Sequence, residues 1–270
     1  MRFLRTMALA AALAGSAEAS ADGTGTWTGS VLPGTYASPT GLSFGPDGSL
    51  YVTEWSAGQV SRIGQDGAKT VLSRHVRSPS GIAVGPDHTL YVASYADGVV
   101  YRLRAGGRAQ AFVRGLRTPA GLALGRGGTL LIADRGLNQI LRADASGKTQ
   151  VVARNLPTPV GVVEWADGTL VVSNFTGSVM ALAADGSRTV LTSRLGAPAV
   201  GIVADGGDAV LVPDYAGTSV WRVARDGEAA AVIRDLPSPV AMARSADGRE
   251  LAVGSWGDGS VRRLRREPAR

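Results

Sequence analysis

The sequence repeats itself with a period of 40 residues, and this period constrains the fold more than any other feature. Five glycines and one alanine mark the repeat, most of them two places after a proline: Gly41, Gly81, Gly121, Gly161, Gly201 and Ala241. Regular self-similarity of this length is the signature of a protein built from copies of one supersecondary unit. We therefore expect six packed copies of one unit rather than a single layered core.

Each unit contains four short β-prone runs separated by turns. In the first unit the run Leu50–Thr53 follows the turn Gly45-Pro-Asp-Gly48, and the turn Asp66-Gly67 precedes the fourth run. Asp-Gly and Pro-Asp-Gly turns between apolar or β-branched runs are typical of antiparallel strands joined by tight hairpins. Four strands in about 40 residues make one propeller blade. The sequence thus predicts an all-β, six-bladed β-propeller of four-stranded blades.

The two ends of the chain complement each other. The sixth unit stops after three β-prone runs, the last of them at 260–263, and lacks a fourth. Residues 25–31 precede the first Pro-x-Gly motif, in the position that a fourth run occupies in the other units. We predict that this N-terminal strand completes the last blade and closes the ring, which leaves only short, protected sheet edges.

The first 21 residues are predicted to be a secretory signal peptide. Arg2 and Arg5 precede an apolar run at 7–14, and small residues suited to cleavage follow at 17–21. This order of a basic, an apolar and a small-residue segment is typical of signal peptides. The apolar run is also shorter than the roughly 20 residues of a membrane helix. We expect residues 22–270 to form a single propeller domain, periplasmic or secreted, with no membrane span.

Composition narrows the range of partners. The chain has no cysteine, which excludes disulfides and thiolate-bound metals. Its formal net charge is +6, but no nucleic-acid recognition motif accompanies the charge, so we expect no specific nucleic-acid partner. The expected state is a monomer that binds a small molecule, a sugar or a peptide.

Two stretches carry a resemblance to known families. Residues 131–140 resemble the NHL-repeat consensus, and residues 39–54 resemble the repeat of streptogramin lyases. At the level of the repeat, nearly the whole mature chain is similar to NHL-repeat and SMP-30/gluconolactonase-like propellers. The resemblance implies the six-bladed fold and leaves the activity open, because propellers host many unrelated functions.

The sequence departs from both enzyme families at the residues that would carry chemistry. The gluconolactonase resemblance implies a divalent cation, usually calcium, held partly by Glu or Asn just before the innermost strands. The corresponding positions carry poor cation ligands: Thr40, Ser80, Ala120, Val160, Val200 and Val240. The streptogramin lyase resemblance implies a histidine that acts with a glutamate. The chain has only two histidines, and we expect His75 near the rim and His88 at the end opposite the binding face.

The same period places two rings of side chains at the end of the second strand of each unit. The first, the polar ring, consists of Glu54, Ser94, Asp134, Asn174, Asp214 and Ser255. The next residue in each unit forms the second, the aromatic–arginine ring: Trp55, Tyr95, Arg135, Phe175, Tyr215 and Trp256. Because antiparallel strands return their ends to one face, we expect both rings on the face that carries the second-to-third strand turns.

Two functions fit these rings. In the first, the chain is a scaffold without demonstrated catalysis whose aromatic–arginine ring binds a small or extended ligand. In the second, Glu54, Asp134, Asn174 and Asp214 hold calcium or another divalent cation as an altered ligand set. The cation would polarise the carbonyl of a lactone or ester for hydrolysis. No catalytic residue is assigned in either case.

Purely structural roles compete with both functions. Asp and Asn at strand ends commonly form hydrogen bonds with the backbone of the turn that follows, and aromatic side chains after the polar ring can pack between blades. The sequence therefore defines a face and two rings of candidate residues, and it leaves open whether the chain is an enzyme.

Overall fold

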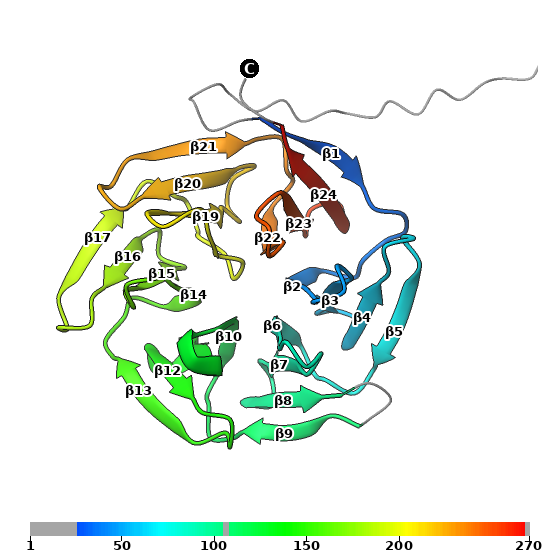
Figure 1. Cartoon of the computed structure of the whole chain (residues 1–270), viewed down its shortest axis with the longest axis horizontal. Helices are drawn as coiled ribbons and strands as arrows, with labels where there is room; N and C mark the ends of the chain where they lie inside the picture. Colours follow the sequence, from blue (N-terminus) through cyan, green and yellow to red (C-terminus); the bar gives the residue numbers. More distant parts are fainter. Residues whose placement is uncertain (1–25, 105–107, 268–270) are drawn as a thin grey trace, which may run out of the picture.

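The computed structural model describes residues 26–104 and 108–267, and it contains six four-stranded antiparallel sheets arranged as blades around a central axis (Figure 1). The predicted six-bladed, all-β propeller is therefore confirmed. The predicted signal peptide, residues 1–21, lies outside the described residues. Within the described ranges, no helix is long and apolar enough to cross a membrane.

In each blade the first strand lies next to the axis and the last lies at the rim (Figure 1). The first blade contains β2 (Pro39–Phe44), β3 (Leu50–Glu54), β4 (Gln59–Ile63) and β5 (Lys69–Ser73). The second contains β6 (Pro79–Val84), β7 (Leu90–Ser94), β8 (Val99–Leu103) and β9 (Gln110–Val113). The third contains β10 (Pro119–Leu124), β11 (Leu130–Asp134), β12 (Gln139–Ala143) and β13 (Thr149–Ala153), together with the short 3-10 helices η1 (Arg126–Gly128) and η2 (Arg135–Leu137).

The remaining three blades follow the same order around the axis. The fourth contains β14 (Pro159–Glu164), β15 (Leu170–Asn174), β16 (Val179–Leu182) and β17 (Arg188–Thr192). The fifth contains β18 (Val203–Ala204), β19 (Ala209–Pro213), β20 (Val220–Ala224) and β21 (Ala229–Ile233). The sixth contains β22 (Pro239–Arg244), β23 (Glu250–Ser255), β24 (Ser260–Arg266) and β1 (Trp27–Val31).

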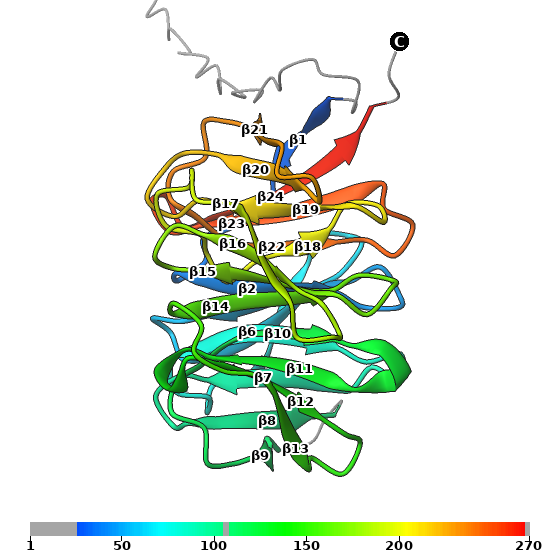
Figure 2. The ribbon, with the colours of Figure 1, turned by 90° about the vertical axis from the view of Figure 1, so that its left-hand side faces the viewer.

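The ring closes by pairing the two ends of the described chain. Strand β1 is antiparallel to β24, in a register that runs from Trp27 opposite Arg266 to Val31 opposite Arg262. The edge-on view shows the two strands side by side (Figure 2). The predicted closure by an N-terminal strand is therefore confirmed, and the sixth blade has no unpaired outer β24 edge.

Close approach of neighbouring blades near the axis explains the glycine that marks the repeat. A Cβ atom on Gly121 would lie 2.5 Å from the carbonyl oxygen of Val160 in the next blade, closer than atoms can pack. The sixth blade carries Ala241 at this position, and it pairs with Gly254 on β23. In the first blade the corresponding pair is Gly41 with Thr53. The sixth blade has thus exchanged the small residue between its two inner strands.

Apolar side chains fill the spaces between successive blades. Between the fourth and fifth blades, Trp165 and Val171 pack against Val210 and Val212, and all four are almost fully buried. The indole N–H of Trp165 donates to the carbonyl oxygen of Ala209, 3.2 Å away, which ties the two blades together. Because each blade buries its faces against two neighbours, the ring forms a rigid support for the loops at its two ends.

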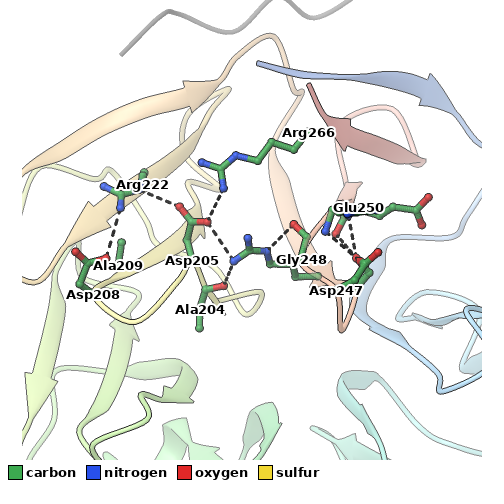
Figure 3. A network of polar contacts seen from close by, with 12 residues as sticks. Ala204, Asp205, Asp208, Ala209, Arg222, Asp247, Gly248, Glu250 and Arg266 are labelled. Carbon is green, nitrogen blue, oxygen red and sulfur yellow. Dashed lines mark hydrogen bonds and ion pairs between the residues drawn. The ribbon is translucent and has the colours of Figure 1, made fainter. Parts of the chain in front are cut away.

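The seam between the fifth and sixth blades is also held by charge (Figure 3). Asp205, whose side chain is 6% exposed, lies 2.9 Å from Arg222, 3.1 Å from Arg244 and 3.4 Å from Arg266. Its carboxylate therefore joins β20, β22 and β24, so that three of the chain's positive charges share one buried counterion. A charge with this many partners serves the structure of the seam.

Candidate ligand-binding site

The polar ring lies at the end of the second strand of each blade, and all six of its side chains are buried. Asp134 accepts hydrogen bonds from the backbone N–H groups of Arg117 and Thr118, at 3.2 and 3.0 Å, in the loop that leads into β10. Asp214 does the same with Gly196 and Ala197, at 3.0 and 2.8 Å. These carboxylates therefore hold the leading loop of their own blade, and not the turn that follows them as strand-end aspartates commonly do.

Glu54 is the most heavily hydrogen-bonded member of the polar ring. Its carboxylate accepts from the Ala37 N–H at 3.0 Å, from Gln59 at 2.6 Å and from Ser61 at 2.8 Å. Lys69 lies 2.9 Å from it. Burial by itself raises the pKa of Glu54, but these hydrogen bonds outweigh burial and hold the pKa below its ordinary value. Glu54 is therefore an ionised, internally paired carboxylate rather than a proton donor or acceptor waiting for a substrate.

The uncharged members of the polar ring differ in their partners, and Ser94 contacts both the carboxylate and the backbone N–H of Asp97 in the following turn. Ser94 donates to the carbonyl oxygen of Arg77 at 2.7 Å. The Asn174 side-chain amide donates to the hydroxyl of Ser178 at 3.2 Å, whereas its Oδ1 has no hydrogen-bond partner. The buried hydroxyl of Ser255 also has none. The contribution of the ring to loop positioning therefore differs from blade to blade.

The four polar-ring residues proposed from sequence as metal ligands do not come together as a ligand set. Within residues 26–104 and 108–267, no group of three or more histidine or carboxylate side chains could hold an ion. The oxygens of Glu54, Asp134 and Asp214 accept hydrogen bonds from backbone N–H groups of their own blades. Hard cations need several converging oxygens, so this donor set does not fit a divalent cation.

The aromatic–arginine ring is built on a backbone contact that recurs in the blades. The N–H groups of Trp55, Phe175 and Trp256 donate to the carbonyl oxygens of Ser38, Thr158 and Ser238, at 2.9 to 3.0 Å. Each of these acceptors directly precedes the proline that begins the innermost strand of its blade and has a positive φ of 50 to 64°. Such a φ is unfavourable for residues other than glycine, so the leading loops adopt their sharp turn at a conformational cost. These backbone hydrogen bonds fix the positions of the ring residues at the mouth of the propeller.

The structure brings all six side chains of this ring into one closed circuit. Neighbours contact one another around it at the following separations: Trp55–Tyr95 5.1 Å, Phe175–Tyr215 6.3 Å, Tyr215–Trp256 5.8 Å and Trp256–Trp55 6.2 Å between ring centroids. Arg135 completes the circuit, with its guanidinium 4.6 Å from the centre of the Phe175 ring and 3.4 Å from the Tyr95 hydroxyl. All of these side chains are half-buried.

The circuit encloses a cavity of about 260 Å³. Its floor is formed mainly by small or apolar residues at or near the start of the innermost strands: Thr40, Ser80, Ala120, Val160, Ala199, Val200 and Val240. Arg135 is the one charged side chain among the described lining residues. Two buried polar atoms of the lining, Ser80 Oγ and Trp256 Nε1, have no hydrogen-bond partner.

Neither histidine lies at this cavity. His88 lies in the turn between β6 and β7, at the opposite end of the blade, and His75 lies beyond β5 toward the rim. Among the described lining residues there is no histidine, aspartate or glutamate. The cavity can therefore stack, orient and hydrogen-bond a ligand, and its lining contains no carboxylate or imidazole to transfer a proton.

Sequence reasoning missed the two unpartnered polar atoms of the lining. It considered Ser80 only as an unsuitable metal ligand and Trp256 only as an aromatic surface. The 40-residue period does place Ser80 near the start of an innermost strand, and the structure has it as the second residue of β6. The lack of a partner for its hydroxyl depends on packing around the axis, which no local pattern reports.

Comparisons with known proteins agree with this fold. The model of the virginiamycin B lyase family matches residues 23–268, and no curated protein matches the sequence. Similar solved structures include a gluconolactonase from Xanthomonas campestris, with a TM-score of 0.79 and 19% identity over 94% of this chain and 98% of that one.

Two further solved structures are similar to this chain. The calcium-binding protein regucalcin from Agrobacterium tumefaciens has a TM-score of 0.75 and 18% identity, over 91% of this chain and 96% of that one. A catalytically inactive virginiamycin B lyase from Staphylococcus aureus, solved with quinupristin, has a TM-score of 0.67 and 17% identity, over 95% of this chain and 97% of that one. At these identities the likeness concerns the fold.

Proposed function

The chain belongs to the virginiamycin B lyase family, and from that premise we propose that it binds a small, flat organic molecule in the cavity enclosed by the aromatic–arginine ring. The observation that carries the proposal is the closed circuit of five aromatic side chains and one arginine around about 260 Å³. The proposal places this binding in the periplasm or outside the cell, in keeping with the N-terminal segment that resembles a signal peptide.

The exposure of the aromatic side chains supports binding rather than packing between blades. Trp165, which does pack between blades, is 1% exposed, whereas the five aromatics of the circuit are half-buried and face a shared cavity. Aromatic faces on a mostly apolar floor favour a flat ligand with an apolar body. Ligand pockets commonly measure roughly 300 to 1,000 Å³, so this one suits a molecule of one or two fused rings.

A fluorescence-coupled screen tests the proposal. Two of the five tryptophans, Trp55 and Trp256, line the cavity, so a bound aromatic compound should change the intrinsic emission of the protein. We expect flat one- and two-ring compounds to bind and raise the melting temperature. Trp55→Ala should weaken the binding of each hit at least tenfold, and Trp221→Phe, outside the cavity, should not change it. Hits that bind the Trp55→Ala and Tyr215→Ala variants as tightly as they bind the wild-type protein would contradict the proposal.

A metal-dependent hydrolase is the second candidate, and the likeness in fold to a gluconolactonase and to a calcium-binding protein favours it. The polar ring argues against it, because its carboxylates are occupied within their own blades. A thermal melt with chelator, then with calcium, magnesium, manganese or zinc, separates the two candidates. A cation at a hundredfold excess over its dissociation constant stabilises a fold by about 2.7 kcal/mol. We expect no cation to raise the melting temperature. A rise that Asp214→Ala abolishes would instead support the metal-dependent hydrolase.

A further inference from the structure

We propose that the ligand of this cavity is an organic anion, a flat molecule that carries a carboxylate or a group of similar charge and shape, and that Arg135 selects it. The inference rests on the proposed function, because it names the class of molecule that the cavity binds. Its starting point is that Arg135 is the one member of the aromatic–arginine ring that departs from the repeat.

The departure at Arg135 lies in the side chain and not in the backbone. The Arg135 N–H donates to the carbonyl oxygen of Thr118 at 3.1 Å, just as the Trp55 N–H donates to Ser38 at 3.0 Å. An aromatic residue could therefore occupy this position, as it does in the five other blades. A guanidinium at the same point of the circuit changes what the wall offers to a ligand, from an apolar face to a fixed positive charge.

The guanidinium of Arg135 has no carboxylate partner among the described residues. Its contacts are the face of Phe175 at 4.6 Å and, at 3.4 Å, the hydroxyl of Tyr95. The adjacent Asp134 does not neutralise it, because that carboxylate is turned toward the leading loop and accepts from Arg117 and Thr118. Arg135 thus places an uncompensated charge in a mostly apolar, half-enclosed wall, which is unfavourable unless an anion joins it.

Several arginines of the propeller are paired with a carboxylate, as Arg135 is not within the part of the chain that the structure describes. Arg222 and Arg244 share the buried carboxylate of Asp205 (Figure 3), and Arg142 lies 2.9 Å from Glu164. In each of these cases a nearby carboxylate neutralises the charge. Arg135 lacks such a partner at the mouth of the cavity, so its counterion is expected to come from outside the protein.

The way Arg135 is held suits a planar anionic group. The guanidinium lies over the Phe175 ring, and its one side-chain hydrogen bond among the described residues, to Tyr95, occupies only one of its five N–H donors. A carboxylate that approaches in the plane of the guanidinium can accept two parallel hydrogen bonds, which is the strongest geometry available to arginine. Aromatic walls can also attract cations, but the fixed charge of Arg135 repels them from this cavity.

The opposite wall adds a second requirement. Trp256 belongs to the sixth blade, across the axis from the third blade that carries Arg135 (Figure 1). Its indole nitrogen is buried and has no partner, and an indole N–H can only donate. The cavity therefore fits a flat body with an anionic group at one end and a hydrogen-bond acceptor toward the other.

Three probes with the same ring system test the inference on the chain from residue 22. They are 2-naphthoate, its neutral amide, and the cationic 2-naphthylmethylammonium, and their dissociation constants are measured by tryptophan fluorescence and calorimetry. We expect the wild-type protein to bind the carboxylate at least tenfold more tightly than the amide and to bind the cation most weakly. Arg135→Met should weaken the binding of the carboxylate at least tenfold and remove its preference over the amide.

Arg117→Met is the matched control, because Arg117 is exposed on the leading loop of the same blade and does not line the cavity. This variant should keep the tenfold preference for the carboxylate, and a thermal melt of Arg135→Met should show that the variant is folded. Equal binding of carboxylate and amide to the wild-type protein, weakened together by Trp55→Ala, would overturn the anion inference and leave the proposed function intact. Binding of none of the three probes would overturn both.

Discussion

The polar ring and the aromatic–arginine ring lie one residue apart in every blade, yet their side chains meet opposite surroundings. Asp134 is fully buried, and its oxygens accept hydrogen bonds from the leading loop of its blade. Arg135, the next residue, is half-buried at the cavity and has no carboxylate partner among the described residues. In the third blade, two successive residues at one strand end thus have different roles: the side chain of Asp134 holds the leading loop, and that of Arg135 lines the cavity.

The largest effect that tests this comparison is expected from Asp134→Ala. Two backbone N–H groups, of Arg117 and Thr118, would lose their acceptor. Each unsatisfied group costs about 1 to 3 kcal/mol, so we expect the free energy of unfolding to fall by about 3 kcal/mol, measured by urea denaturation. Arg135→Ala should change it by no more than about 0.5 kcal/mol. Equal losses in the two variants would break the distinction between the rings.

Glu54→Gln should have a smaller effect that depends on pH. The folded state holds the pKa of Glu54 below its ordinary value of 4.5. The contribution of its ionised form is therefore fully present above that pH and is lost as the pH falls through the folded-state pKa. We expect the variant to be about 1 to 2 kcal/mol less stable at pH 7, and the deficit to shrink between pH 4.5 and pH 3.

Urea denaturation of both proteins across this pH range gives the difference directly, and the other carboxylates cancel in it. Glu228→Gln, at an exposed glutamate of the turn before β21, is the control and should show no deficit. A deficit for Glu54→Gln that stays constant down to pH 3 would contradict a role for the charge of Glu54. The shape and hydrogen bonds of the side chain would then account for the whole deficit.

Most of the fold could be predicted from the sequence because its determinants are periodic. The spacing of Gly41 and its equivalents predicts the number of blades, and the missing run after residue 263 predicts closure by β1. The sequence shows alanine at position 241, where the other units have glycine. That its partner on the facing strand is Gly254 could not be predicted. It depends on which of two facing strands carries the small residue, and both arrangements leave room near the axis.

The candidate site could be predicted in position but not in chemistry. The period predicts both rings and their shared face, and the structure brings the six aromatic–arginine residues around one cavity. The hydrogen-bond donors to the Asp134 carboxylate could not be predicted, because they lie 16 and 17 residues earlier in a leading loop. The charge of Arg135 was visible, whereas its lack of a counterion is a property of the whole surrounding surface.

Asn174→Ala sharpens the comparison within the polar ring itself. Asn174 donates to Ser178 and accepts from no leading-loop N–H group, in contrast to Asp134. If loop amides are what make this ring stabilising, the loss should be about 1 kcal/mol, the worth of one ordinary hydrogen bond. Urea denaturation beside Asp134→Ala measures it. A loss as large as that of Asp134→Ala would show that burial, and not the loop contact, sets the cost.

The smallest effect on stability is expected from Trp256→Phe, and it completes the comparison. The indole N–H of Trp256 has no partner, so removing it breaks no hydrogen bond, while an aromatic ring remains to contact Trp55 and Tyr215. The free energy of unfolding should change by about 0.5 kcal/mol or less. Binding of 2-naphthoate should weaken several-fold if the ligand accepts a hydrogen bond from that indole. A loss of stability with unchanged binding would give Trp256 a structural role. The distinction between the two rings would then not hold in the sixth blade.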